Sequence, residues 1–215
     1  MSKECARIHE LAHTLPRHSF PFAEDAIPGN GIYLLFEQGE TGHEGDRIVR
    51  VGTHNGEDQL LPRLRQHFLI ELKDRSIFRK NIGRAILNRD GDPFLASWDL
   101  DMIPRTAREK HASSIDFDYQ KLIEKQVSKF IQANFSFCVF RIDGRNDRLD
   151  TETRLISTVA ACDACRPSAG WLGHHSPKSK IREGGLWLVN KLNGETYDSG
   201  DLRLLPGIIR RHQGA

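Results

Sequence analysis

Hydrophobic residues recur every three or four positions in some segments of this chain and cluster in short runs in others. The longer spacing is that of one helix face, and short runs rich in β-branched and aromatic residues are typical of strands. The pattern predicts helices over 4–14, from about 58, over 76–88, over 119–133 and from about 150. It predicts strands over 31–36, 47–52 and 135–142.

The order of these elements predicts an α/β (α+β) fold: a small antiparallel three-stranded sheet flanked by helices, with helical N-terminal and inserted segments. A polar, glycine-rich linker between the first two strands favours a wide hairpin loop. We expect a helical extension over 1–28, a central domain over 29–175 with an insertion at about 90–133, and a C-terminal extension over 176–215. Asn193-Gly194 indicates a possible hairpin over 186–196.

The composition is that of a globular chain, since 38% of its 215 residues are hydrophobic and no run approaches the roughly 18 apolar residues of a membrane span. The first residues contain no apolar leader segment, so we expect a cytoplasmic protein without a membrane partner. Four cysteines at irregular spacing are too few for a disulfide framework, so we expect reduced thiols: Cys5, Cys138, Cys162 and Cys165.

The net charge of +2 says little about a partner, but the charges are unevenly distributed. Residues 63–89 contain eight Lys and Arg against Glu71 and Asp74. Such a stretch is either a solvated helical face or a surface that faces phosphate groups.

Four short motifs follow one another along these elements. Gly31-Ile-Tyr33 opens the first strand, and Arg50-Val-Gly52 ends the second. On the next helix Arg63 and His67 stand four positions apart, so their side chains share one face. Glu152 lies in the predicted first turn of the helix that follows the third strand, with Asp150 as its expected N-cap.

This succession resembles the GIY-YIG nuclease family over roughly residues 29–175. The first motif matches the family's GIY element, and the second stands in the place of YIG. The segments 63–68 and 150–156 are similar to the family's helix with its arginine and histidine and to the segment with its metal-binding glutamate. Arg50 replaces the tyrosine of YIG, so the role of that phenol is not carried over, and the distance from Gly52 to Arg63 is slightly longer than usual. The resemblance implies a divergent nuclease with a small antiparallel sheet and one bound cation.

Hydrolysis of a phosphodiester needs an activated water and neutralisation of the charge on the phosphate. The resemblance implies that Arg63 grips phosphate oxygens and that Glu152 holds one Mg²⁺ (or Mn²⁺) ion. Tyr33 is expected to orient or deprotonate the water, and His67 to polarise Tyr33 or to act as the base itself.

The implied substrate is DNA, double-stranded in our interpretation. Arg50, Arg65, Lys178 and Lys180 are expected to contact it, the lysines through backbone phosphates. Arg63 and Arg65 are two positions apart on a helix, so one of them faces away from the catalytic site. Double-strand cutting with one site per chain favours a homodimer.

Other interpretations of the same residues stay open. Tyr33 can be a core aromatic, and a carboxylate at 152 can serve to offset the dipole of a helix that begins there. Glu124 is a rival metal ligand, although it precedes the third strand. Trp171, in the turn-rich stretch 166–177, either fills the core or belongs to a loop that shapes a substrate groove.

Two further function classes are compatible with the sequence. Arg50 in place of tyrosine suits a catalytically inactive nucleic-acid-binding protein that retains the fold. Cys162 and Cys165, followed by His174 and His175, allow a zinc site in an interaction protein, although this spacing fits no common zinc finger well.

Overall fold

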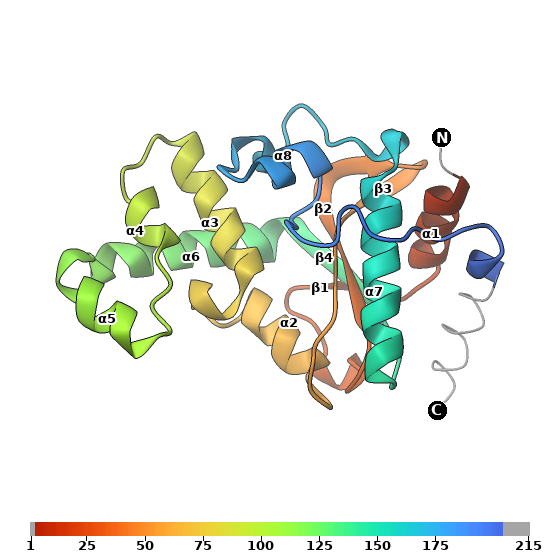
Figure 1. The fold of residues 1–215 in the computed structure, drawn as a ribbon, viewed down its shortest axis with the longest axis horizontal. Helices are drawn as coiled ribbons and strands as arrows, with labels where there is room; N and C mark the ends of the chain where they lie inside the picture. Colours follow the sequence, from red (N-terminus) through yellow and green to blue (C-terminus); the bar gives the residue numbers. More distant parts are fainter. Residues whose placement is uncertain (1–2, 204–215) are drawn as a thin grey trace.

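The longest strand, β2 (Ile32–Gly42), lies inside a four-stranded antiparallel sheet (Figure 1). It pairs with β3 (Gly45–Gly52) on one side and with β4 (Phe135–Phe140) on the other, and β1 (His18–Ser19) extends the sheet beyond β4. The structure is a computed structural model and describes residues 3–203. The expected α+β fold is confirmed, with one strand more than expected. A two-residue strand such as β1 is too short to leave a pattern in the sequence.

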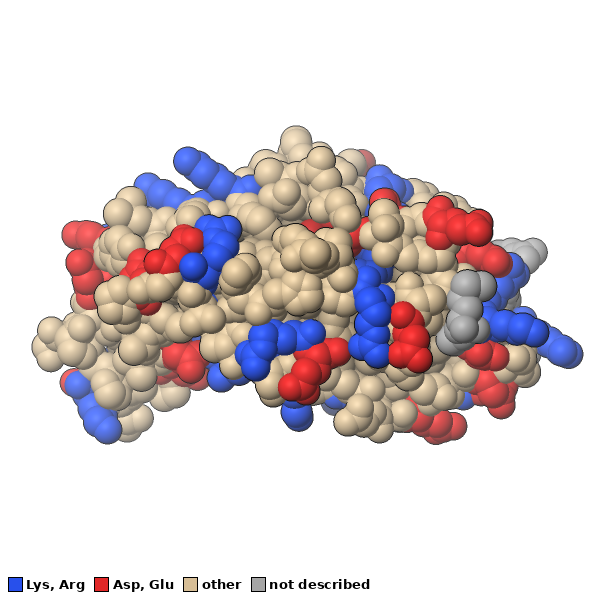
Figure 2. Space-filling model, turned by 90° about the horizontal axis from the view of Figure 1, so that it is seen from above, with Lys and Arg blue, Asp and Glu red and all other residues tan. Residues whose placement is uncertain are grey.

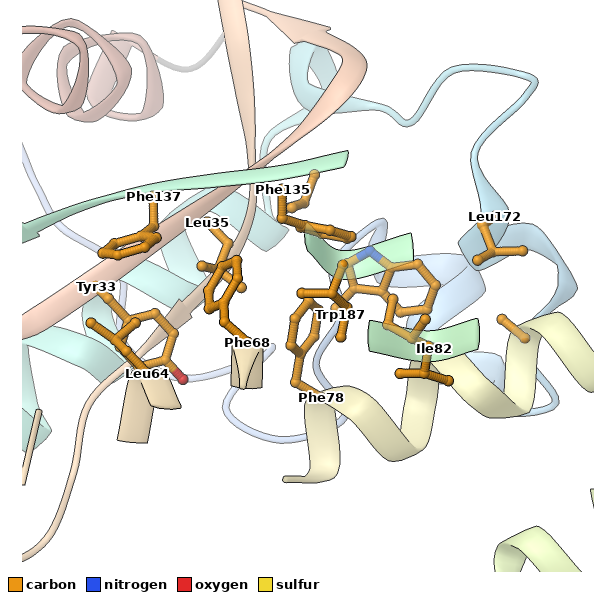
Figure 3. Close-up of a cluster of buried hydrophobic side chains, with 14 of the residues drawn as sticks. Tyr33, Leu35, Leu64, Phe68, Phe78, Ile82, Phe135, Phe137, Leu172 and Trp187 are labelled. Carbon is orange, nitrogen blue, oxygen red and sulfur yellow. The ribbon is translucent and has the colours of Figure 1, made fainter. Parts of the chain in front are cut away.

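The side chains of β2 alternate between two hydrophobic clusters, one on each face of the sheet. Tyr33 and Leu35 point into the first cluster, which they share with Phe137 of β4 (Figure 3). Ile32 and Leu34 point into the second cluster. Because both faces are covered, the strand is a continuous apolar run rather than an alternation of apolar and polar residues.

Helices cover both faces of the sheet. The first cluster packs against α2 (Leu60–Phe68), α3 (Ile77–Arg89) and α6 (Phe117–Asn134). The second packs against α1 (Lys3–His13) and α7 (Arg145–Ala160). The other helical segments are α4 (Leu95–Asp99), α5 (Arg105–His111), α8 (Ser179–Gly184) and the 3-10 turns η1 (Glu24–Ala26), η2 (Lys73–Arg75), η3 (Ala112–Ser114), η4 (Asp163–Cys165), η5 (Leu172–His175) and η6 (Asp201–Arg203). None of the described helices has the length and apolarity that crossing a membrane requires.

The helix that contains Glu152 begins earlier than predicted. α7 starts at Arg145 with Gly144 as its N-cap, so the prediction of an N-cap at Asp150 is wrong. Gly144 has the extended φ of −63° and ψ of 122° of an N-cap, and Asp147 supplies the acidic side chain of the first turn. Glu152 therefore lies in the middle of the helix, where stabilisation of the N-terminal dipole no longer explains it.

The connection between β2 and β3 is a tight turn and not the wide loop that the glycines suggested. His43 and Glu44 are its two central residues, with φ of 52° and 63°. A two-residue hairpin turn with positive φ at both positions matches the twist of the two strands. It normally takes Asn or Gly, so His43 is an unusual residue for its place.

The predicted hairpin over 186–196 is wrong, because no strand forms there. The backbone of this segment bonds to other elements instead. The N–H of Trp187 donates to the carbonyl of Val49 in β3 at 2.8 Å. The N–H of Gly194 donates to Oγ of Ser157 in α7 at 3.0 Å. The last part of the expected C-terminal extension, 204–215, lies outside the described residues.

The basic stretch 63–89 is partly internal. Six of its eight basic side chains form ion pairs: Arg65 with Glu24, Lys73 and Lys80 with Asp74, Arg79 with Glu124, Arg84 with Asp99, and Arg89 with Asp90. Arg79 is fully buried. Carboxylates of the protein face these six side chains, so the interpretation of the whole stretch as a phosphate-facing surface is wrong. Figure 2 shows basic and acidic side chains interspersed over one face, without a continuous basic area there.

A buried carboxyl of β2 lies between two tryptophans. Oε2 of Glu37 accepts the indole N–H of Trp171 at 2.9 Å and that of Trp187 at 2.8 Å. Burial raises the pKa of Glu37 to about 7, although the two indole donors act in the opposite direction. Trp171 is 2% exposed. It fills the core, as one of the two interpretations of its loop predicted.

Candidate active site

The candidate site is built around Tyr33, at the start of β2. Its ring packs in the first hydrophobic cluster and is fully buried (Figure 3). Across the β2–β3 pair it faces Gly52. A Cβ atom at position 52 would lie 2.2 Å from the phenol oxygen of Tyr33. Glycine at the end of β3 therefore leaves the space that the hydroxyl occupies.

The hydroxyl of Tyr33 contacts two residues expected at the site. Its oxygen lies 2.8 Å from Nε2 of His67 and 3.4 Å from Nε of Arg50. Arginine only donates, so we assign the hydroxyl hydrogen of Tyr33 to Nε2 of His67. The proton of the neutral imidazole is then on Nδ1, 2.7 Å from Oγ of Ser76. Ser76 is the N-cap of α3, so the start of this helix fixes the orientation of the ring.

His67 is held in its neutral form. It is fully buried, and burial lowers the pKa of the imidazole well below its ordinary value of 6.5. The guanidinium groups of Arg63, Arg50 and Arg79 shift this pKa in the same direction. A neutral imidazole has a lone pair that accepts the hydrogen of Tyr33.

Arg50, in the place of the YIG tyrosine, lies inside the protein. Only 4% of its surface is exposed. Its Nη1 donates to the carbonyl of Trp187 at 2.5 Å, and its charge stands 5.4 Å from the ring centre of Phe78. Arg50 thus supplies a positive charge beside the hydroxyl of Tyr33, and its expected contact with DNA stays a prediction.

A cleft of about 330 Å³ opens at the start of α2. Its lining residues are Thr53, His54, Asn55, Gly56, Gln59, Pro62, Arg63 and Gln66. Nη1 of Arg63 donates to Oε1 of Gln66 at 3.0 Å and to the carbonyl of Arg75 at 3.2 Å. The guanidinium therefore lies at the cleft and keeps further N–H groups for an anion.

Glu152 reaches the end of β3 from α7. Its Oε1 accepts the N–H of Thr53, a cleft residue, at 3.0 Å. Its Oε2 lies 2.5 Å from Nζ of Lys191. Tyr33 and Glu152 thus meet the same short backbone segment, residues 52–53. Arg63 lines the cleft, Glu152 bonds to the cleft residue Thr53, and the rings of Tyr33 and His67 bond to each other inside the protein.

Three expected DNA contacts do not join this group. Arg65 is paired with Glu24, with its Nε 2.7 Å from Oε1. Lys178 has its Nζ 3.8 Å from a carboxylate oxygen of Asp99. Lys180 is exposed on α8, which contacts η5. Their role on DNA stays a prediction.

A larger cavity of about 830 Å³ lies nearby, but its charges do not suit a phosphate. Asp25, Asp58 and Asp143 line it, against one arginine, Arg141. Carboxylates repel the phosphates of DNA. The smaller cleft at Arg63 is therefore the better candidate for the scissile group.

The rival metal ligand Glu124 is used within the protein. One carboxylate oxygen accepts the N–H of Lys73, and the other accepts Nε and Nη2 of Arg79 at 3.3 Å and 2.9 Å. Its carboxylate is buried and saturated with donors. Glu124 therefore stabilises the contact between α6 and α3, and the metal role of this residue is not supported.

Two residues near the site gave no signal of their own in the sequence. His54 donates from Nδ1 to the carbonyl of Gly56 at 2.7 Å and accepts the N–H of Gly31 at 3.2 Å, so it ties the cleft loop to the GIY segment. Lys191 comes from the C-terminal segment and pairs with Glu152. A lysine so far from the motifs in sequence cannot be placed without the fold.

A GIY-YIG domain profile matches residues 10–215, nearly the whole chain. The chain therefore belongs to the GIY-YIG domain family, a family of nuclease-like proteins. No curated protein and no solved structure shows significant similarity to the chain.

The family usually uses a divalent metal ion. The carboxylate of Glu152 is partly exposed beside a polar cleft and has the hard oxygen donors that Mg²⁺ prefers. Lys191 holds one of the two oxygens, so a metal ion bound there would compete with this ammonium group for the carboxylate.

Proposed function

We propose that this protein is a metal-dependent endonuclease that hydrolyses phosphodiester bonds in double-stranded DNA. The proposal is supported by the hydrogen bond between Tyr33 and His67, by Arg63 in the cleft, and by Glu152, which accepts the N–H of the cleft residue Thr53. These are the four residue types that phosphodiester hydrolysis needs: a base, its partner, an anion-binding cation and a metal ligand.

In the proposed reaction a phosphate of DNA enters the cleft and binds the guanidinium of Arg63. The attacking water gives its proton to the oxygen of Tyr33 while the hydroxyl hydrogen of Tyr33 passes to Nε2 of His67. His67 accepts it because its imidazole is neutral. The water oxygen forms the new bond to phosphorus, and the bond from phosphorus to the leaving sugar oxygen breaks. The leaving oxygen takes up a proton from solvent water, and His67 returns its proton to solvent. Both rings are buried, so DNA binding has to expose them.

A divalent ion, when bound, neutralises charge on the phosphate and on the leaving oxygen. Glu152 is the residue of this chain that would hold it, with Mg²⁺ or Mn²⁺ as the fitting ion. Oε1 of Glu152 is oriented by the N–H of Thr53, and this hydrogen bond keeps the carboxylate at the cleft.

The test is cleavage of supercoiled plasmid DNA by the purified full-length protein with Mg²⁺ or Mn²⁺. Wild type is expected to nick or linearise the plasmid, and Arg63→Ala and Glu152→Ala are expected to lose this activity. Arg63→Lys is the matched variant for the arginine, because it retains the charge and loses the fork that holds two oxygens. Asp150→Asn is the matched control for the glutamate, since Asp150 is exposed on the same helix.

A second candidate is an inactive nucleic-acid-binding protein. The complete burial of Tyr33 and the presence of Arg50 on its hydroxyl favour it. Wild type that binds DNA but never cuts it with either metal ion would replace the nuclease proposal by this one. Cleavage that survives in both Arg63→Ala and Glu152→Ala would remove the proposed site.

A further inference from the structure

At the turn end of the β2–β3 hairpin, four metal-binding side chains come together from three separate segments. Cys5 and His9 stand four positions apart on α1, His43 lies in the hairpin turn, and Cys165 ends η4 after α7. One ligand atom from each lies within 4.8 Å of every other. In the described part of the chain this is the group of Cys, His and acidic residues whose spacing suits a metal ion.

We propose that Cys5, His9, His43 and Cys165 bind one zinc ion, a structural site separate from the catalytic cleft. Two sulfur and two nitrogen ligands are a common set for structural zinc, and the ion prefers them in a tetrahedron. The proposal does not depend on the nuclease activity and holds whether or not the chain cleaves DNA.

The distances in the cluster are close to those that one shared ion imposes. Sγ of Cys5 lies 3.5 Å from Sγ of Cys165. In a tetrahedral site with Zn–S bonds of about 2.3 Å, two sulfur ligands lie about 3.8 Å apart. A disulfide would need about 2.05 Å. Nε2 of His9 lies 3.8 Å from Sγ of Cys165, near the spacing of a nitrogen and a sulfur on one ion.

His43 gives the second, independent observation. Its Nδ1 is buried and has no hydrogen-bond partner among the described residues. Buried polar atoms are almost always bonded, so this nitrogen calls for an explanation. A metal bond to the ring would explain this orphaned nitrogen.

Zinc binds cysteine as the thiolate. Binding of the ion would therefore displace the hydrogen that lies between the sulfurs of Cys5 and Cys165, which are 3.5 Å apart.

His9 also has a role in the sheet. Its Nδ1 donates to the carbonyl of Cys5 at 2.9 Å, a bond typical of the outer nitrogen of a metal-bound imidazole. Its Nε2 accepts the N–H of Ile48 on the outer side of β3 at 3.1 Å. A bound ion would take the place of that amide hydrogen. Because Nε2 of His9 already has a partner in the protein, a variant of His9 tests the proposed ligand set most directly.

The proposed zinc ligands differ from those that the sequence suggested. Cys165 belongs to the cluster, whereas His174 and His175 are exposed, and His174 bonds to the carbonyl of Ser168 at 2.9 Å. Cys162 lies beside the cluster, with its Sγ 3.3 Å from Nε2 of His43. It is the obvious alternative to His9 as fourth ligand.

The test is the metal content of the purified full-length protein, measured by mass spectrometry and by release to a chromophoric chelator. About one zinc ion per chain is expected. Cobalt in place of zinc should give the visible bands of tetrahedral coordination and a charge-transfer band from thiolate. These two readouts on wild type do not depend on whether any variant folds.

Single variants then identify the ligands. Cys5→Ser, Cys165→Ser, His43→Asn and His9→Gln are each expected to weaken zinc binding at least about tenfold. Cys162→Ala and Cys138→Ala, the latter a buried cysteine of β4, are the matched controls and should retain the ion. Retention by His9→Gln together with loss in Cys162→Ala would overturn the proposed ligand set. Wild type without stoichiometric metal, or with a disulfide between Cys5 and Cys165, would overturn the site itself.

Discussion

The two ends of the β2–β3 hairpin differ in chemistry although they belong to one pair of strands. The open end, at Tyr33 and Gly52, gathers a phenol, an imidazole, a guanidinium and a carboxylate. The turn end, at His43, gathers thiols and imidazoles. Oxygen ligands suit Mg²⁺, which exchanges easily and retains water, whereas sulfur and nitrogen ligands suit zinc, which binds tightly.

The two ends of the hairpin also differ in the exposure and the partners of their metal-binding groups. At the open end Glu152 is partly exposed and is paired with a partly exposed lysine, so its partner can be replaced by a metal ion and substrate. At the turn end the two sulfurs are buried among protein atoms. The open end is therefore suited to the exchange of a metal ion and substrate. The turn end is suited to a permanent contact between α1 and the sheet.

The largest effect is expected from Glu152→Gln. Loss of the carboxylate charge should lower the rate of metal-dependent cleavage by about 10³-fold, the size seen when a group that stabilises the transition state is removed. The zinc content at the turn end should stay at the wild-type value. A simultaneous loss of zinc and activity would show that the two ends are not independent.

Gly52 and Gly42, near opposite ends of the hairpin, allow a matched pair of substitutions. Gly52→Ala would bring a Cβ to 2.2 Å from the oxygen of Tyr33, whereas Gly42→Ala would bring one to 3.3 Å from Sγ of Cys165. Gly52→Ala should lower the free energy of unfolding by about 1–3 kcal/mol, as overpacking does, and should reduce cleavage by displacing the phenol. Gly42→Ala should leave cleavage unchanged. Urea unfolding and plasmid cleavage measure both, and equal behaviour of the two variants would contradict the close packing at Tyr33.

Stability should depend on pH through His67. In the unfolded chain its imidazole takes up a proton below about pH 6.5, whereas burial keeps the folded form neutral. The unfolded state therefore gains protons as pH falls from 7 to 5.5, and the free energy of unfolding falls by about 1 kcal/mol. His67→Gln should have a correspondingly smaller slope in urea titrations at these two pH values. The same slope in both proteins would mean that His67 is protonated in the fold.

The smallest effect is expected from Lys191→Met. Its ammonium lies on the oxygen of Glu152 that a metal ion would share, and a pair with this exposure contributes about 0.2–1 kcal/mol. Removing it should lower the Mg²⁺ concentration for half-maximal cleavage about two- to fivefold. Lys125→Met, an exposed lysine on α6, is the control of equal charge. A higher Mg²⁺ requirement in Lys191→Met would show that the lysine assists the metal ion.

The sequence could predict the open end better than the turn end. Tyr33, Gly52 and His67 belong to short motifs on neighbouring elements, so the order of those motifs was enough to bring them together. Cys5 and His43 lie far apart in sequence and outside any spaced motif, so only the fold brings them together.

Charge was the least predictable property. A run of basic residues has the same pattern whether it faces water or carboxylates contributed from elsewhere, and Arg79 meets Glu124 on a helix that comes much later in the chain. The start of α7 was missed for a related reason. A glycine N-cap such as Gly144 gives a weaker signal than Asp150, which the periodicity favoured.

Trp171 and Trp187, which both donate to Glu37, provide an intrinsic fluorescence probe. Trp171 and Trp187 donate to one carboxyl whose pKa is about 7, so two of the three indoles sense a single ionisation near neutral pH. The carbonyl of Trp187 also accepts the guanidinium of Arg50, which in turn reaches Tyr33. Intrinsic fluorescence can therefore follow rearrangement around the phenol without any attached label.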